Sequence, residues 1–194
     1  MLFFASYASM APMAANRATR VRESMLAALL WLTLASAARA DDPCAAFSWD
    51  VRHERELFGQ VPHSLSAAST PDTAPTLTAD QLYELKLVKE SQTSFAAAPG
   101  GKHSAAGTYA GLARLSVPSA GLWRISLDGK FWIDVLAQGT PIQSQDFQGR
   151  PGCDAPHKIV EFTLPAGTPL MLQFSGGSSA TLKIAVTRSP PRAP

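Results

Sequence analysis

The feature that most constrains this chain is a series of short segments in which apolar and polar residues alternate. Period-two alternation gives an extended strand one apolar and one polar face. Such segments occur at 83–87, 113–117, 123–127, 131–135, 160–164, 170–174 and 182–186. Gly, Pro, Ser and Asp clusters separate them, often at the spacing of about 8–12 residues that is typical of sandwiches. The sequence therefore predicts an all-β fold, an antiparallel, jelly-roll-like β-sandwich of about seven to eight strands.

One turn between these segments carries a specific signal. Asp128-Gly129 lies between the segments 123–127 and 131–135. This dipeptide favours a type I′ turn, which needs positive φ, and such turns join neighbouring strands of one sheet. A β-hairpin is predicted at this position. The segments 60–80 and 143–157 are predicted to be irregular connections because Ser, Thr, Pro and Gly interrupt any periodic pattern.

The region before the strands has helical spacing. Apolar residues recur at intervals of about one helical turn among charged residues: Phe47, Val51 and Phe58. Asp42 is a suitable cap, and Pro43 suits the first turn. A short N-terminal helix is therefore predicted at about 43–58.

Residues 1–40 have the pattern of a secretory signal peptide. Three arginines at 17, 20 and 22 precede an apolar run at 25–34, and Ala38-Arg39-Ala40 fits the small-residue cleavage rule. Cleavage is expected before Asp41. The run is shorter than the roughly 20 apolar residues of a membrane span. The sequence thus predicts a periplasmic or secreted protein with no membrane anchor after cleavage, consisting of one domain at 41–188 and a disordered tail at 189–194.

The charge balance excludes one class of partner. The leader holds four of the 17 basic residues and one of the 15 acidic residues, which leaves 13 basic and 14 acidic residues in the mature chain. A domain whose net charge is near zero lacks the basic surface that attracts nucleic acids. We therefore expect no nucleic-acid partner.

The two cysteines, Cys44 and Cys153, both survive cleavage. In an oxidising compartment, a lone pair most simply forms a disulfide. The chain-entropy argument gives a closed loop of about 110 residues up to about 4.7 kcal/mol of stabilisation. The pair is predicted to tie the N-terminal segment to a late loop.

Two resemblances to known families follow from particular motifs. GLWRISL at 121–127, LPAG at 164–167 and LQFSG at 172–176 resemble the β-sandwich modules of the pre-peptidase C-terminal type, which are appended to secreted bacterial peptidases. This resemblance implies a non-catalytic module, since such modules bind carbohydrate or calcium in some cases.

The whole mature chain also resembles a group of small secreted bacterial proteins of unknown function. They share an early Cys-x-x-Phe-x-Trp, here 44–49, a central Trp-Ile-Asp-Val, here 132–135, and a later cysteine. Some members are labelled homogentisate 1,2-dioxygenase. The residues do not support that label, because such an enzyme would hold Fe(II) with two His and one Glu in a much longer cupin chain. This sequence has no His-x-His, and its four histidines are dispersed.

Chemistry-bearing residues are sparse. One histidine has potential metal ligands near it in the sequence: His157, with Asp154 and Glu161. The mature chain has no Gly-x-Ser-x-Gly nucleophile elbow. Three aspartates could still meet in space: Asp128, Asp134 and Asp146. We predict no catalytic residue, no metal site and no cofactor, with a metal-dependent enzyme, dioxygenase-like or hydrolase, as the alternative.

Trp132 and Asp134 are the predicted ligand-binding residues. Alternation directs both away from the apolar face of their strand. An outward tryptophan beside a carboxylate can stack on a sugar ring and bond its hydroxyls. The alternative is that the N-terminal helix covers this face and that Trp132 packs under Phe47 or Trp49.

These observations predict an exported, non-catalytic binding or envelope-associated module. Its expected ligand is a polysaccharide or another envelope component. Two alternatives remain open: the metal-dependent enzyme, and an accessory protein that docks on another exported protein through a sheet edge.

Overall fold

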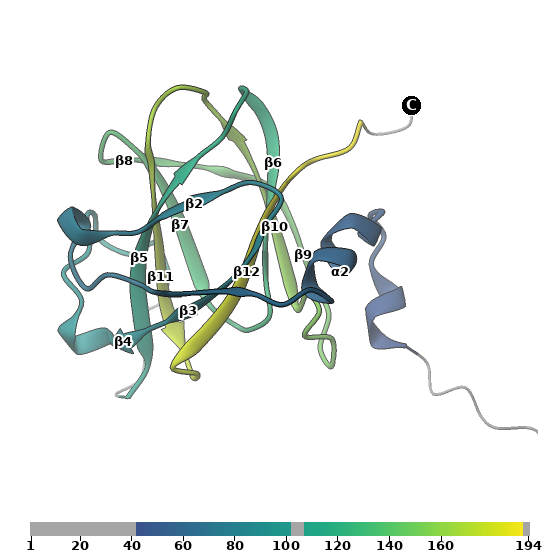
Figure 1. Ribbon diagram of the computed structural model, residues 1–194, viewed down its shortest axis with the longest axis horizontal. Coiled ribbons are helices and arrows are strands. Elements are labelled where there is room, and N and C mark those ends of the chain that lie inside the picture. The colour runs from purple at the N-terminus through teal and green to yellow at the C-terminus, as the bar shows by residue number, and fades with distance from the viewer. Residues whose placement is uncertain (1–41, 102–106, 192–194) are drawn as a thin grey trace, which may run out of the picture. The chain divides into compact units, whose positions relative to one another are not determined.

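The computed structural model describes residues 42–101 and 107–191. They form two sheets packed face to face, as Figure 1 shows, which confirms the predicted β-sandwich. The first sheet has the order β1 (His63–Ser66), β3 (Leu82–Lys86), β12 (Thr181–Arg188), β6 (Gly121–Leu127), β10 (Lys158–Leu164), β9 (Ser144–Gly149). The second has the order β2 (Thr76–Thr78), β5 (Tyr109–Ser116), β11 (Leu170–Gly177), β7 (Trp132–Ala137), β8 (Thr140–Ile142), and β4 (Val88–Lys89) pairs with β5. The predicted leader and its predicted cleavage site lie outside the described residues.

The connections give the sandwich its jelly-roll-like topology. From β5 to β7 each strand crosses to the opposite sheet, and β10, β11 and β12 do the same. Most pairs are antiparallel, but β1 pairs with β3, and β2 with β5, in parallel. The sheets are therefore mixed at one edge each, where the sequence predicted an antiparallel fold throughout.

All seven predicted strands are present, and five more lie within the described residues: β1, β2, β4, β8 and β9. Four of these five lie at or next to a sheet edge and are short or mostly exposed, so they carry little apolar alternation. The segments 60–80 and 143–157, predicted to be irregular, contain the strands β1, β2 and β9.

The predicted hairpin at Asp128-Gly129 is wrong. β6 belongs to the first sheet and β7 to the second, so this segment crosses between sheets. Neither residue has the positive φ of a type I′ turn. Asp128 instead accepts a 3.0 Å hydrogen bond from the backbone N–H of Lys183 on β12. A contact between residues far apart in the sequence thus sets the path of the chain after β6, which the local turn signal did not predict.

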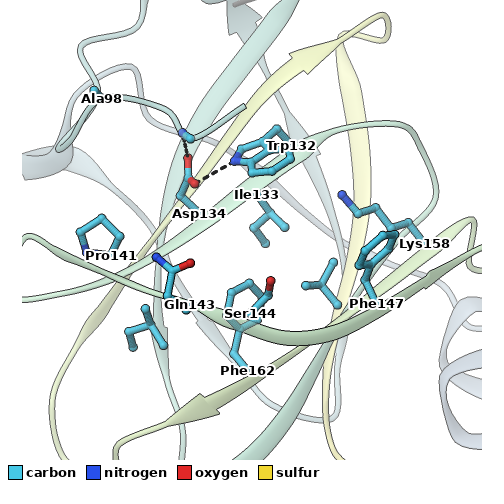
Figure 2. A pocket seen from close by; sticks show the side chains of 13 residues that line it. Ala98, Trp132, Ile133, Asp134, Pro141, Gln143, Ser144, Phe147, Lys158 and Phe162 are labelled. Carbon is cyan, nitrogen blue, oxygen red and sulfur yellow. Dashed lines mark hydrogen bonds between the residues drawn. The ribbon is translucent and has the colours of Figure 1, made fainter. Parts of the chain in front are cut away.

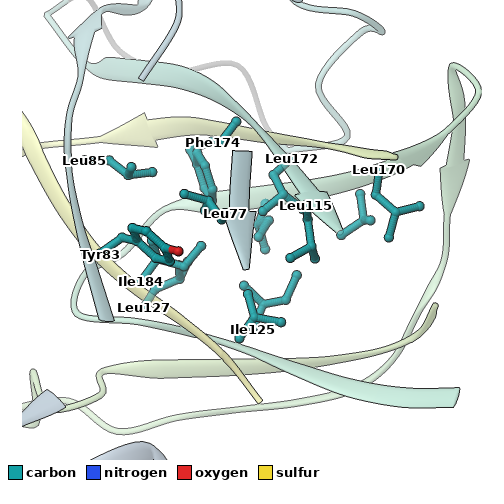
Figure 3. Close-up of a cluster of buried hydrophobic side chains, with 14 of the residues drawn as sticks. Leu77, Tyr83, Leu85, Leu115, Ile125, Leu127, Leu170, Leu172, Phe174 and Ile184 are labelled. Atoms are coloured by element: carbon teal, nitrogen blue, oxygen red, sulfur yellow. The ribbon is translucent and has the colours of Figure 1, made fainter. Parts of the chain in front are cut away.

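The inner faces of both sheets form one apolar core, shown in Figure 3. Its fully buried side chains come from alternate positions of the predicted strands: Leu85, Leu115, Ile125, Leu127, Leu172, Phe174, Leu182 and Ile184. Burying each such side chain contributes about 1.5–3 kcal/mol. This core fixes which face of each strand points outward.

The N-terminal helix is shorter than predicted. Residues 43–58 form a 3₁₀ turn, η2 (Pro43–Ala46), and a helix, α2 (Arg52–Phe58), separated by non-helical backbone. Asp42 caps only the first, through a 2.9 Å bond from the N–H of Cys44. Two further 3₁₀ turns are η3 (Pro71–Thr73) and η4 (Glu90–Gln92). No helix among the described residues has both the length and the apolar character to cross a membrane.

Helix α2 packs on the outer face of the first sheet. Its Leu57 and Phe58 bury against Leu82 on β3 and Ala185 on β12. Trp49, just before the helix, lies over the guanidinium of Arg124, 4.8 Å from the ring centroid. The helix therefore covers the sheet opposite to the one that carries Trp132.

A buried ionic network lies beneath α2. Arg124 donates to Glu161 over 3.0 Å and pairs with Glu54 of α2 at 3.4 Å. Thr187 donates to Glu54, and Ser189 donates to Glu161. Because Ser189 is buried and bonded, the folded chain extends past the point where the tail was predicted to begin.

The predicted disulfide is confirmed. Cys44 and Cys153 are bonded, with their Cα atoms 5.1 Å apart and a sequence separation of 109. Arg150 adds a hydrogen bond to the carbonyl of Ala46, and its guanidinium lies 5.3 Å from the ring centroid of Phe47. The bond is compatible with folding in an oxidising compartment.

Candidate ligand-binding site

A hollow of about 470 Å³ opens on the side of the sandwich, where β7 and β8 face β9 and β10. Its volume lies within the roughly 300–1,000 Å³ that is usual for small-molecule sites. Figure 2 shows its lining: Ala98, Gly100, Trp132, Ile133, Asp134, Pro141, Ile142, Gln143, Ser144, Phe147, Lys158, Val160 and Phe162. Both predicted ligand-binding residues are among them.

The hollow exists because the two sheets part at this side. β8 pairs only with Val135–Ala137 of β7, so Trp132–Asp134 have no partner on β8. The chain then crosses at Gln143 to β9 in the other sheet, where a β-bulge shifts the register against β10 between Glu161 and Phe162. The space between these diverging strands forms the hollow.

Trp132 stands at its mouth with 45% of its surface exposed. Its Nε1 donates a 2.8 Å hydrogen bond to Oδ1 of Asp134, and the N–H of Gly100 donates to Oδ2 over 3.1 Å. Gly101 lies so close that an added Cβ would be 2.7 Å from Cγ of Trp132. The indole is thus oriented by a carboxylate and backed by glycine backbone.

Trp132 does not pack under the N-terminal segment. Phe47 contacts Arg150, and Trp49 contacts Arg124 on the outer face of the other sheet. The alternative in which the helix covers Trp132 is therefore wrong, because the disulfide and α2 hold that segment against the first sheet.

The floor of the hollow is apolar. Ile133, Val160 and Phe162 are buried core residues whose outer surfaces line it. Phe147 rises from β9 with 66% of its surface exposed. A ligand here would meet an aromatic side chain at two places, Trp132 and Phe147.

Lys158 adds a cationic side chain to the lining of the hollow. Its Nζ donates to the carbonyl of Phe131 over 3.2 Å and lies 5.6 Å from the centroid of the Trp132 ring. Burial of this ammonium lowers the pKa of Lys158 from its ordinary value, because desolvation disfavours the charged form. The hollow therefore contains both a carboxylate and a partly desolvated ammonium.

The residues of the metal alternative are not brought together. Glu161 bonds with Arg124 under α2, and Nδ1 of His157 donates to the carbonyl of Cys153 over 3.0 Å. Asp154 is exposed. No group of three His, Cys, Asp or Glu side chains that could hold a metal ion occurs within 42–101 and 107–191.

The three aspartates that could have met in space have separate partners. Asp128 accepts from Lys183, and Asp134 accepts from Trp132 and Gly100. Asp146 accepts from the N–H of Phe147. No two of them share a hydrogen-bond partner in these contacts.

Sequence reasoning missed Phe147 and Lys158. Phe147 lies in a polar stretch without alternation, and β10 is the one described strand that pairs with its own strand, β9. Lys158 precedes a predicted strand but gives no local sign of pointing into a hollow. An isolated phenylalanine between polar residues was the one available signal.

Comparisons with known proteins add little. No family model matches the chain, and no curated protein does. A solved structure of a β-glucosidase from Kluyveromyces marxianus in complex with glucose is similar over 43% of this chain and 10% of its own, at 17% identity and a TM-score of 0.30. So low a TM-score carries no argument about fold or function. The two family resemblances stay predictions.

Proposed function

We propose that this protein is an exported, non-catalytic glycan-binding module that holds a polysaccharide or another glycan of the cell envelope. The observation that carries this proposal is the indole of Trp132, fixed by Asp134 at the mouth of the apolar hollow. A sugar ring has an apolar face that stacks on an aromatic ring and hydroxyls that bond carboxylates and amides. The hollow offers both kinds of contact.

Export is part of the proposal. The leader at 1–40 supports it, and the Cys44–Cys153 bond is compatible with an oxidising extracytoplasmic compartment. Mass spectrometry of protein recovered from the periplasm or medium would test it. A chain beginning at Asp41 is expected, and an uncleaved cytoplasmic chain would refute export.

Binding is tested with a glycan microarray followed by calorimetry. Wild-type protein should bind at least one glycan class, and Trp132→Ala should weaken that binding at least about tenfold, since stacking and burial are lost together. Trp49→Ala is the matched control, because Trp49 packs on Arg124 at the outer face of the other sheet, and its loss should leave binding unchanged. Absence of binding to any glycan would overturn the proposal.

A second candidate is docking of a protein partner. Trp132–Asp134 of β7 lack a β8 partner, and such an edge can accept a strand from another chain. A partner purified with this protein would then protect the β7 backbone amides from hydrogen exchange. Unprotected amides in the complex would eliminate this candidate.

A further inference from the structure

A second hollow lies next to the first. It measures about 280 Å³ and is lined by Lys130, Phe131, Phe147, Gly149, His157 and Lys158. Phe147 and Lys158 also line the first hollow. The second is smaller than the roughly 300 Å³ of the smallest usual ligand sites. It is therefore better explained as an extension of the first than as a separate site.

The charges of the two hollows differ. The second is lined by two lysines and a histidine, and no carboxylate is among the described residues that line it. In the first, Asp134 already accepts hydrogen bonds from Trp132 and Gly100 through its two oxygens. Asp146 lies beside Phe147 and accepts its backbone N–H. Two lysines therefore line the second hollow, and one of them, Lys158, also lines the first. The carboxylate of Asp146 lies on the flanking strand, β9.

Lys158 lies where the two hollows meet, and not all N–H donors of its ammonium are used within the part of the protein that the structure describes. An ammonium has three N–H donors, and one bonds the carbonyl of Phe131. Among the described residues, Lys158 forms no ion pair with a carboxylate. A partly buried cation without a protein counter-ion is stabilised when an anionic ligand group bonds to it.

We infer that the two hollows form one groove for an acidic oligosaccharide, with a uronic-acid carboxylate bonded to Lys158 beside Phe147. This inference rests on the proposed glycan-binding function and specifies the class of glycan. Trp132 stacks on one sugar in the first hollow. Phe147 contacts the next part of the chain, which continues toward Lys130 and His157. An acidic glycan longer than the first hollow can hold is the expected ligand.

The test is calorimetry on the exported, disulfide-bonded protein. The probes are oligomers of polygalacturonate and of alginate, as short and long forms, and the same oligomers after reduction of their carboxyl groups to alcohols. The acidic forms should bind about 10- to 100-fold more tightly than the reduced forms, the range for a charge-assisted hydrogen bond. Lys158→Met should abolish this difference, while Lys86→Met, an exposed lysine on β3 outside both hollows, should preserve it.

The Phe147→Ala variant tests whether the second hollow extends the first as a binding groove. Long oligomers should bind more tightly than short ones to the wild type, and this advantage should disappear in the variant. Phe147 is so exposed that its truncation leaves the core intact. The salt dependence of wild-type affinity gives a measurement that needs no variant, since binding of the acidic forms should weaken as salt rises.

The outcomes separate this inference from the proposed function. Equal affinity for acidic and reduced oligomers would overturn the inference, and so would a Lys158→Met variant that still prefers the acidic forms. In either case, Trp132-dependent binding to a neutral glycan would still uphold the proposed function. Failure of all glycans to bind would overturn both.

Discussion

The indole of Trp132 donates a 2.8 Å hydrogen bond to Asp134, two residues further along β7. Alternation directs both side chains to the outward face of the second sheet, and Gly100 bonds the second oxygen of the same carboxylate. The aromatic ring is thereby held in one orientation before any ligand arrives. Such preorganisation lowers the entropy lost on binding.

Removal of this carboxylate should therefore impair binding more than folding. Asp134→Ala is expected to weaken glycan affinity by about 10- to 100-fold, because a bond to a charged acceptor and the orientation of Trp132 are lost. The free energy of unfolding should change by less than about 1 kcal/mol, since the site is partly exposed. Calorimetry and urea unfolding measure the two effects. Asp72→Ala, an exposed carboxylate outside the hollow, is the control, and equal affinity losses in both variants would contradict the assignment.

Gly101→Ala tests the backing of the indole. The added methyl would lie 2.7 Å from Cγ of Trp132, so the ring must shift. Weaker glycan binding and an altered tryptophan fluorescence are expected. In Gly59→Ala the new methyl meets only two backbone oxygens, that of Glu56 at 3.4 Å and that of Arg55 at 3.7 Å. Both signals should therefore stay at the wild-type level. An unaltered Gly101→Ala variant would show that the indole is free to move.

Arg124→Ala should strongly destabilise the domain. It removes the guanidinium that pairs with the buried carboxylates of Glu54 and Glu161, and breaking a buried pair typically costs about 3–5 kcal/mol. Arg52→Ala removes an exposed ion pair with Asp50 and should leave stability nearly unchanged. Urea unfolding of both variants gives the comparison. A loss no greater in Arg124→Ala than in Arg52→Ala would refute the structural role of the network.

Loss of the disulfide should cost about 2–5 kcal/mol of unfolding free energy, since the unfolded chain is then no longer closed into a long loop. The measurement is urea unfolding of the Cys44→Ser/Cys153→Ser variant. Glycan affinity should persist, because neither cysteine lines the hollow. Abolished binding in a folded variant would mean that the bond also shapes the site.

Asp128 predicts a pH dependence. Burial raises the pKa of Asp128 above its ordinary value of 3.8. Between 3.8 and the raised pKa, the folded state binds more protons than the unfolded state, so the contribution of Asp128 to stability falls as pH rises through this window. Asp128→Asn keeps an acceptor for Lys183 without the charge. Its unfolding free energy relative to wild type should therefore increase from acid to neutral pH in urea titrations; a constant difference would refute the shift.

The sequence by itself determined the strands that carry the core. Leu85, Leu127 and Leu172 are buried and lie in alternating segments. The register of strand pairing is fixed in such segments, because a slip of one residue would turn all the apolar side chains of the strand toward solvent. The same alternation placed Trp132 and Asp134 on an outward face. The pairing of Cys44 with Cys153 followed because the chain has no other cysteine.

Only the tertiary structure decided how these strands are connected and where the hollow lies. The turn signal of Asp128-Gly129 is local, whereas the path between sheets is set by a bond to Lys183, which is 55 residues away. Phe147 and Lys158 became neighbours of Trp132 because β8 leaves β7 early and β9 pairs with β10. Edge strands are stabilised by backbone hydrogen bonds to a neighbouring strand, and these bonds form whatever the side chains are. Their sequences therefore carry little trace of the site that they build.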